Sequence, residues 1–132
     1  MNSVKVRQLF DYDTWTYTYL LWCEKTKQCL LIDSVLEQVD RDLGLITKLG
    51  LKLEYIFETH VHADHITAAD TIRSKTDAKV VYGSKTGVNG CDICLKDNVY
   101  QIGFKENEFL VNANYIISMD LIYMISFTKF CT

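Results

Sequence analysis

The stretch FETHVHADHITAAD, residues 57–70, contains all three histidines of this 132-residue chain. His60, His62 and His65 fall within six positions, and Asp64 lies among them. The residues before the cluster predict an apolar strand and those after it predict a helix. Because α/β folds place their ligand sites where strands end, this stretch predicts a functional site on a strand–loop–helix unit.

The types and spacing of these side chains predict metal binding. In an extended segment His60 and His62 point to the same side, so both can bind one ion. Asp64 and His65 follow the bend and offer a second pair of ligands. Neutral imidazole suits zinc and iron, and a carboxylate adds an oxygen donor. We therefore predict His60, His62, Asp64 and His65 as metal ligands, with Asp64 also catalytic, and we disfavour packed or surface roles for so dense a cluster.

Strands are predicted along the chain before the cluster. Thr and aromatic residues favour a pleated surface, and the polar turn Glu24–Gln28 predicts a hairpin between the second and third strands. In the fourth strand Leu53, Tyr55 and Phe57 are expected on one side and Ile56 on the other. The predicted strands are Val4–Phe10, Thr14–Trp22, Gln28–Asp33 and Leu51–Thr59.

A helix is predicted between the third and fourth strands. Ser34 with Glu37 has the spacing of a capping box, and Asp40 is a competing N-cap. Gly50 occupies the place of a left-handed C-terminal cap. Apolar residues recur at helical spacing on one face: Val39, Leu43, Ile46 and Leu49.

The chain after the cluster continues the alternation of helices and strands. Ile66, Ala69 and Ile72 predict a helix that ends near Lys75, and Ala78–Gly83 predicts a short buried strand. Residues 84–96 are expected to be irregular, and residues 99–111 to form two strands around Gly103. This order predicts a layered α/β fold.

We divide the chain into a partial domain, residues 1–111, and a non-matching tail, residues 112–132, that forms edge strands or is out of frame.

The histidine cluster and its flanks resemble a known family. THVHADH after an apolar strand resembles the signature of the metallo-β-lactamase superfamily. Three segments resemble its persulfide dioxygenases, which are close relatives of the glyoxalase II hydrolases: YTYLL (17–21), LIDSVLEQVDRDLGLITKLGLKL (31–53) and THVHADHITAADTIRSKTDAKVV (59–81). The resemblance extends over about residues 4–111, and it implies the N-terminal half of an αββα sandwich. Where that family usually has Asp-Pro-Val, this chain has Asp33-Ser34-Val35.

The resemblance implies a reaction and a cofactor. Persulfide dioxygenases oxidise glutathione persulfide to sulfite with O2 and one ferrous iron, which two histidines and an aspartate hold as a facial triad. By position His60 matches the first iron ligand. His62, Asp64 and His65 match ligands of the two-zinc relatives and, in the iron enzymes, residues that orient ligands and water. The alternatives are a glyoxalase II-like thioester hydrolase that uses one or two zinc ions, and a non-catalytic remnant that binds metal weakly.

The other two iron ligands of the family pattern have no match in this sequence. No histidine follows His65, the chain has no proline, and the surroundings of Asp120 do not match the family's metal aspartate. We therefore expect an N-terminal fragment that keeps one of the three iron ligands and is impaired as an enzyme. We also expect the inner face of its sheet to be exposed, which would favour homo-oligomers.

Composition and charge narrow the partners and the location. Hydrophobic residues make up 48% of the chain and charged residues 23%, which is ordinary for a soluble domain. A net charge of −3 without a basic block argues against a nucleic-acid partner. The N-terminus lacks the pattern of a secretory signal, and the apolar stretch Tyr115–Phe130 is too short to span a membrane. We expect a cytoplasmic protein that binds a glutathione-linked small molecule.

The cysteines are predicted to be reduced. Their number is five, and an odd count without a secretory signal argues against a disulfide framework. The Cys91-x-x-Cys94 pair is compatible with half a zinc site or a redox pair, but we favour two ordinary thiols because no second pair accompanies it.

Overall fold

The computed structural model describes part of the chain. The described residues are 4–59, 67–83, 91–95, 99–104, 107–112 and 125–126. The predicted ligands His60, His62, Asp64 and His65 lie outside these ranges, as does the predicted tail except for Asn112 and Ile125–Ser126.

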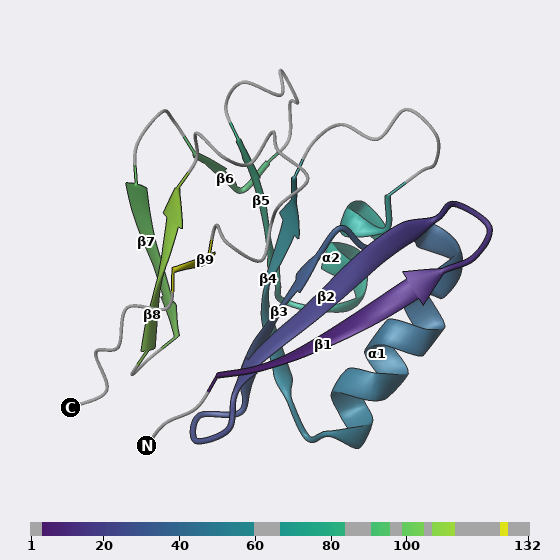
Figure 1. Cartoon of the computed structure of the whole chain (residues 1–132), viewed down its shortest axis with the longest axis horizontal. Coiled ribbons are helices and arrows are strands. Elements are labelled where there is room, and N and C mark those ends of the chain that lie inside the picture. The colour runs from purple at the N-terminus through teal and green to yellow at the C-terminus, as the bar shows by residue number, and fades with distance from the viewer. Residues whose placement is uncertain are drawn as a thin grey trace.

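A six-stranded mixed sheet forms the centre of the molecule (Figure 1). Its order follows the sequence, from β1 to β6. The β1–β2 and β2–β3 pairs are antiparallel, whereas β3, β4, β5 and β6 pair in parallel. The strands are β1 (Val4–Asp11), β2 (Thr16–Cys23), β3 (Gln28–Ile32), β4 (Lys52–Glu58), β5 (Lys79–Gly83) and β6 (Ile93–Leu95). The predicted hairpin between the second and third strands is confirmed.

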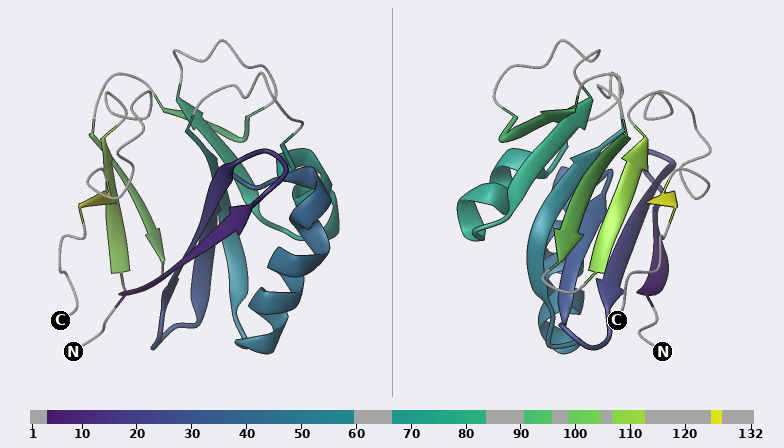
Figure 2. Two further views of the ribbon diagram at one scale, coloured as in Figure 1. Left: turned by 45° about the vertical axis from the view of Figure 1, so that its right-hand side comes forward. Right: turned by 90° about the vertical axis from the view of Figure 1, so that its left-hand side faces the viewer.

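Two helices cover one face of this sheet, and a second sheet lies on the other side (Figures 1 and 2). The helices are α1 (Val39–Lys48), which a 3-10 turn at Leu36–Gln38 precedes, and α2 (Ala69–Lys75). The second sheet contains β7 (Val99–Phe104), β8 (Asn107–Asn112) and β9 (Ile125–Ser126). The described layers are thus α, β and β, in agreement with the predicted class.

The core between the helices and the main sheet follows the predicted apolar face of the first helix. Val39 and Ile46 are buried, and they belong to one cluster with Leu20, Leu31 and Ile56. Removing such side chains from water is the main force that holds the helices on the sheet. The apolar periodicity of the sequence is therefore confirmed for this helix.

The opposite face of the main sheet is also buried. Alternation along the strands directs a second set of side chains away from the helices. These are Leu21, Cys23, Leu30, Ile32, Phe57 and Val81, all buried. The expected exposure of the inner sheet face does not hold for these six residues, because the second sheet lies on that side. Self-association of the chain stays a prediction.

One strand departs from simple alternation. Cys29 pairs with Leu53, but the next residue, Leu30, pairs with Tyr55, so Glu54 is an extra residue in β4. After such a bulge, each following side chain lies on the opposite face of the sheet from the one that simple alternation predicts. Leu53 and Ile56 consequently share the helix-side core, and the prediction that they face opposite sides is wrong.

The predicted caps of α1 differ from the structure. Gln38 is the N-cap of the α-helix and makes no capping hydrogen bond through its side chain. Ser34 and Asp40 are therefore not its caps. The short 3-10 turn begins the helical segment, and the hydroxyl of Ser34 contacts Glu58 instead. Gly50 is confirmed as the left-handed residue after the helix, with φ of 66°.

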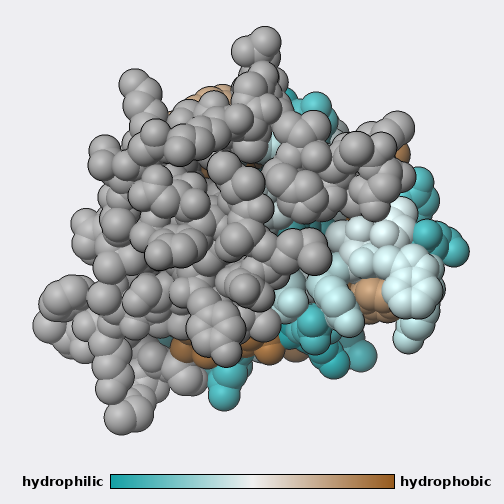
Figure 3. All heavy atoms as spheres, turned by 45° about the horizontal axis from the view of Figure 1, so that its top comes forward, coloured by the Kyte–Doolittle hydropathy of each residue, from teal (hydrophilic) through white to brown (hydrophobic). Residues whose placement is uncertain are grey.

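The remaining elements agree only in part with the sequence. Strand β6 lies within residues 84–96, which were expected to be irregular, so that prediction is wrong there. The two strands predicted for residues 99–111 are present as the antiparallel pair β7 and β8, but Gly103 lies within β7 rather than between them, and β9 pairs with β8. The boundary at residue 112 stays a prediction. On the face seen in Figure 3 the described surface is mostly hydrophilic or neutral, with only small hydrophobic areas. The large exposed hydrophobic side chains among the described residues lie on or near β1 and β2: Val6, Tyr12, Trp15 and Tyr17.

Candidate metal site at the carboxyl ends of β3 and β4

The predicted ligands lie in the segment between β4 and α2, whose two flanks are described. Thr59 directly precedes His60, and Thr67 follows the segment. Strands β3 and β4 are parallel, so their carboxyl ends meet at one edge of the sheet. The geometry of that edge determines where the histidine segment leaves the fold and where it returns.

Asp33 anchors the upstream flank. Its carboxylate accepts one hydrogen bond from the backbone N–H of Thr59, at 2.8 Å, and another from the Thr59 hydroxyl, at 2.7 Å. The backbone N–H of Asp33 donates to the carbonyl of Phe57 at 2.9 Å. Charge-assisted bonds of this kind are stronger than neutral ones. The residue immediately before His60 is therefore held to the end of β3.

The downstream flank returns to the same short segment. Val35 and Thr67 form an isolated antiparallel bridge, and the backbone N–H of Ala68 donates to the carbonyl of Ser34 at 3.2 Å. Ala68 and Val35 are both fully buried. Both flanks of the histidine segment are thus fastened to Asp33-Ser34-Val35.

Asp33 has an unusual backbone conformation that serves this role. Its φ is 54°, in the left-handed region, where aspartate is tolerated better than most residues. The hydroxyl of Thr18 donates to the Asp33 carbonyl at 2.7 Å and stabilises the turn. Residues held in such conformations cluster at functional sites, and here the turn directs the carboxylate toward Thr59.

A second carboxylate is buried beside the first. The hydroxyl of Ser34 donates to Glu58 at 3.4 Å, and both residues are almost completely buried. Burial raises the pKa of the Glu58 carboxyl well above its usual value, and the charge of Asp33 raises it further. Burial, followed by the charge of Glu58, also raises the pKa of Tyr82 on β5. Two acidic side chains thus lie together at this edge, and Glu58 is held toward its neutral form.

The described part of the chain contains no group of three or more His, Cys, Asp or Glu side chains placed to hold a metal ion. The structure does not test the predicted ligands. It identifies instead the residues that hold the two flanks of their segment. In the sequence, Asp33-Ser34-Val35 is marked only by its departure from a family pattern. An acid directly after a buried strand at the ligand edge is the signal that would have identified Asp33.

The four described cysteines divide into two kinds, and Cys131 lies outside the described residues. Cys23 and Cys29 are buried and form no disulfide, as predicted. Cys91 and Cys94 form a disulfide, so the prediction of two ordinary thiols is wrong. The pair can bond because a short loop places its Cα atoms 5.9 Å apart, within the range of natural disulfides.

Fold and sequence comparisons define the class of the protein. The chain has the mixed α/β sheet of the metallo-β-lactamase fold: a metallo-beta-lactamase from Staphylococcus aureus superimposes with a TM-score of 0.72 at 20% identity, over 84% of this chain and 33% of that one. Residues 15–93 match the sequence profile of the metallo-beta-lactamase superfamily. The chain belongs to this superfamily, and membership implies metal ions in general.

Closer similarity is to the persulfide dioxygenases within that superfamily. The mitochondrial persulfide dioxygenase ETHE1 of Mus musculus is 51% identical over 71 residues, which are 54% of this chain. The crystal structure of ETHE1 from Myxococcus xanthus is 46% identical with a TM-score of 0.73, over 80% of this chain. The predicted resemblance is thus confirmed.

The chain matches only part of these relatives. The matched region spans 28% of the mouse protein and 46% of the Myxococcus xanthus chain. Within the described residues no helix is both long and apolar enough to cross a membrane.

Proposed function

We propose that this protein is of the persulfide dioxygenase type, acting in the iron- and O2-dependent oxidation of glutathione persulfide to sulfite. The observation that carries the proposal is the 51% identity over 71 residues to a mouse persulfide dioxygenase. The similarity to ETHE1 of Myxococcus xanthus at 46% identity supports it. The substrate is accordingly a glutathione-linked small molecule.

The donor set of the histidine segment fits a ferrous iron. His60 is proposed as an iron ligand, and His62, Asp64 and His65 as neighbours that orient ligands and water. Bound by these residues, the iron would supply the oxygen chemistry that persulfide oxidation requires. One carboxylate, that of Asp33, lies at the flank that directly precedes His60.

The described residues hold the two flanks of this segment. Asp33 and Thr59 fix the direction in which the chain leaves β4, and Val35 with Thr67 fixes its return. Catalytic groups held within about 0.5 Å of their working geometry need such support from rigid elements. Asp64 is proposed as the carboxylate that accepts a proton or hydrogen bond beside the ligands.

The number of ligands limits the activity of these 132 residues. The iron triad requires two histidine ligands, and His60 is the one that is proposed here. The sequence has no histidine after His65 to serve as the second. We therefore predict weak or no turnover by this polypeptide alone. The two ligand pairs of the segment favour a second candidate, a zinc-dependent thioester hydrolase in which the metal activates water. A non-catalytic remnant is the third candidate.

Metal analysis and oxygen consumption distinguish these candidates. Purified protein loaded anaerobically with ferrous iron should bind it through His60, and any glutathione persulfide-dependent oxygen uptake should disappear in His60→Ala. Preferential retention of zinc with hydrolysis of a glutathione thioester would favour the second candidate and contradict the first. The cytoplasmic location stays a proposal, since the mouse relative is described as mitochondrial.

A further inference from the structure

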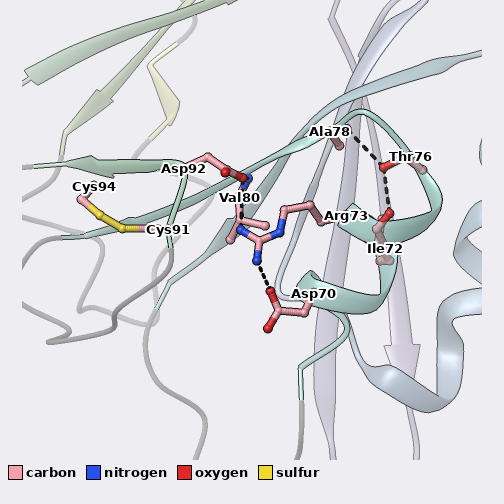
Figure 4. Close-up of polar contacts among 9 residues, drawn as sticks. All are labelled: Asp70, Ile72, Arg73, Thr76, Ala78, Val80, Cys91, Asp92 and Cys94. Atoms are coloured by element: carbon pink, nitrogen blue, oxygen red, sulfur yellow. Dashed lines mark hydrogen bonds and ion pairs between the residues drawn. A yellow bond between two sulfur atoms is a disulfide. The ribbon is translucent and has the colours of Figure 1, made fainter.

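Cys91 and Cys94 form a disulfide at the start of β6, the edge strand of the main sheet. Only Asp92 and Ile93 separate the two cysteines. Figure 4 shows the disulfide beside Asp92, whose carboxylate turns toward β5 and α2. The bond therefore lies at the border of the sheet, away from the helix-side core.

Asp92 holds this loop in place independently of the disulfide. Its backbone N–H donates to the carbonyl of Val80 at 3.0 Å, and its carboxylate accepts from the backbone N–H of Val80 at 2.8 Å. Arg73 donates to the same carboxylate at 3.3 Å and to Asp70 at 2.6 Å (Figure 4). Because these contacts do not involve sulfur, we expect opening of the disulfide to leave the loop attached to β5.

Cys91 and Cys94 are accessible, whereas Cys23 and Cys29 are not. Cys94 is exposed and Cys91 is partly buried. Cys23 and Cys29 are both 0% exposed, and burial raises the pKa of Cys29 to about 12. Thiol chemistry requires both access and thiolate character. Exchange with a reagent in solution is therefore directed to the Cys91–Cys94 pair.

We propose that Cys91–Cys94 is a reversible thiol–disulfide exchange site for a low-molecular-weight thiol such as glutathione. The thiolate of the first thiol attacks the exposed Cys94 sulfur, forms a mixed disulfide and releases Cys91 as a thiolate, which takes up a proton. A second thiolate attacks the small-molecule sulfur and releases the Cys94 thiolate. Two thiols are oxidised to one disulfide and the protein disulfide is reduced to two thiols. This inference does not rest on the proposed function.

The unmodified chain provides the first test. Native protein is incubated with excess reduced glutathione, alkylated and mapped by mass spectrometry, and the treatment is reversed with oxidised glutathione. We expect Cys91 and Cys94 to be alkylated at least about tenfold more than Cys23 and Cys29, with circular dichroism unchanged. A pair that stays oxidised until the protein unfolds, or that does not close again with oxidised glutathione, would overturn the proposal.

Two single variants test which cysteine carries the mixed disulfide. With oxidised glutathione, the thiolate of Cys94 in Cys91→Ser should form the mixed disulfide about tenfold faster than the thiolate of Cys91 does in Cys94→Ser, which is the reverse of the second step. Equal rates, or a faster reaction at Cys91, would contradict a mixed disulfide at Cys94. If either variant does not fold, the glutathione adduct trapped by acid in the unmodified chain gives the same assignment, since its mass label lies on the attacked cysteine.

Discussion

Asp33 binds Thr59 through both of its carboxylate oxygens, and this pair joins the end of β3 to the residue that precedes the histidine segment. Val35 and Thr67 join the other flank of that segment to the same strand end. The two contacts hold both ends of the histidine segment to residues 33–35. The predicted ligands lie between its two attachment points in the sequence.

The Asp33–Thr59 pair should contribute measurably to stability. Thr59→Val removes the hydroxyl donor from a buried carboxylate and is expected to cost about 1–3 kcal/mol of unfolding free energy. Asp33→Asn keeps a side chain that tolerates positive φ and tests the carboxylate itself. Chemical denaturation of both single variants and the double variant measures the coupling, which we expect at about 0.5–3 kcal/mol. Strictly additive losses would show that the two residues do not act as a unit.

Asp11 should make the fold sensitive to acid. The side-chain hydroxyl of Thr14 is the main cause that lowers the pKa of Asp11, followed by the side chain of Gln38. Thr14 donates at 2.6 Å and Gln38 at 2.7 Å. Because the pKa of Asp11 is lower in the folded than in the unfolded chain, the ionised carboxylate stabilises the fold fully when the pH is above the unfolded pKa of about 4. This contribution is lost as the pH falls through the folded pKa.

The measurement is a comparison of urea midpoints at neutral and acid pH. The stability advantage of wild type over Asp11→Asn should be largest at pH 7 and should shrink below about pH 4. Thr14→Ala should show a smaller acid dependence than wild type because the principal hydrogen bond is gone. An advantage that grows on acidification would have the wrong sign for this account.

The helix-side core should tolerate truncation poorly. Leu31 is 0% exposed in the central strand β3, so Leu31→Ala is expected to cost about 2–5 kcal/mol through lost burial and a residual cavity. Val6 on the edge strand β1 is 51% exposed, and Val6→Ala should change stability by less than about 0.5 kcal/mol. Thermal or denaturant unfolding of both variants checks this contrast. Similar losses at the two positions would contradict the assigned core.

Much of the fold follows from local sequence patterns. The apolar periodicity of Val39–Leu49 and the glycine after it predicted the first helix, and alternating or apolar runs predicted the strands. The bulge at Glu54 was not predictable because the register depends on the partner strand, where Cys29 and Leu30 pair with Leu53 and Tyr55. Tertiary contacts decided the caps too, since Ser34 contacts Glu58 across the sheet edge.

The candidate site was predictable only in part. The density of His60, His62, Asp64 and His65 in the sequence predicts a metal-binding segment, and this stays a prediction. The role of Asp33 depends on the parallel pairing of β3 with β4, which brings together residues 26 positions apart. The disulfide likewise depends on how the loop is folded, because the spacing Cys-x-x-Cys alone fits thiols, a metal site or a redox pair.

The central claim is that His60–His65 is the metal-binding part of this chain, and a titration with ferrous iron under anaerobic conditions tests it most directly. The account predicts measurable binding that weakens more than about tenfold in the His60→Ala, His62→Ala double variant, a loss of at least about 1.4 kcal/mol. Asp13 is an exposed acid outside this segment, and the control variant Asp13→Asn should bind ferrous iron as tightly as wild type does. Binding of equal strength in wild type and the double histidine variant, or no binding by correctly folded wild type, would contradict the claim.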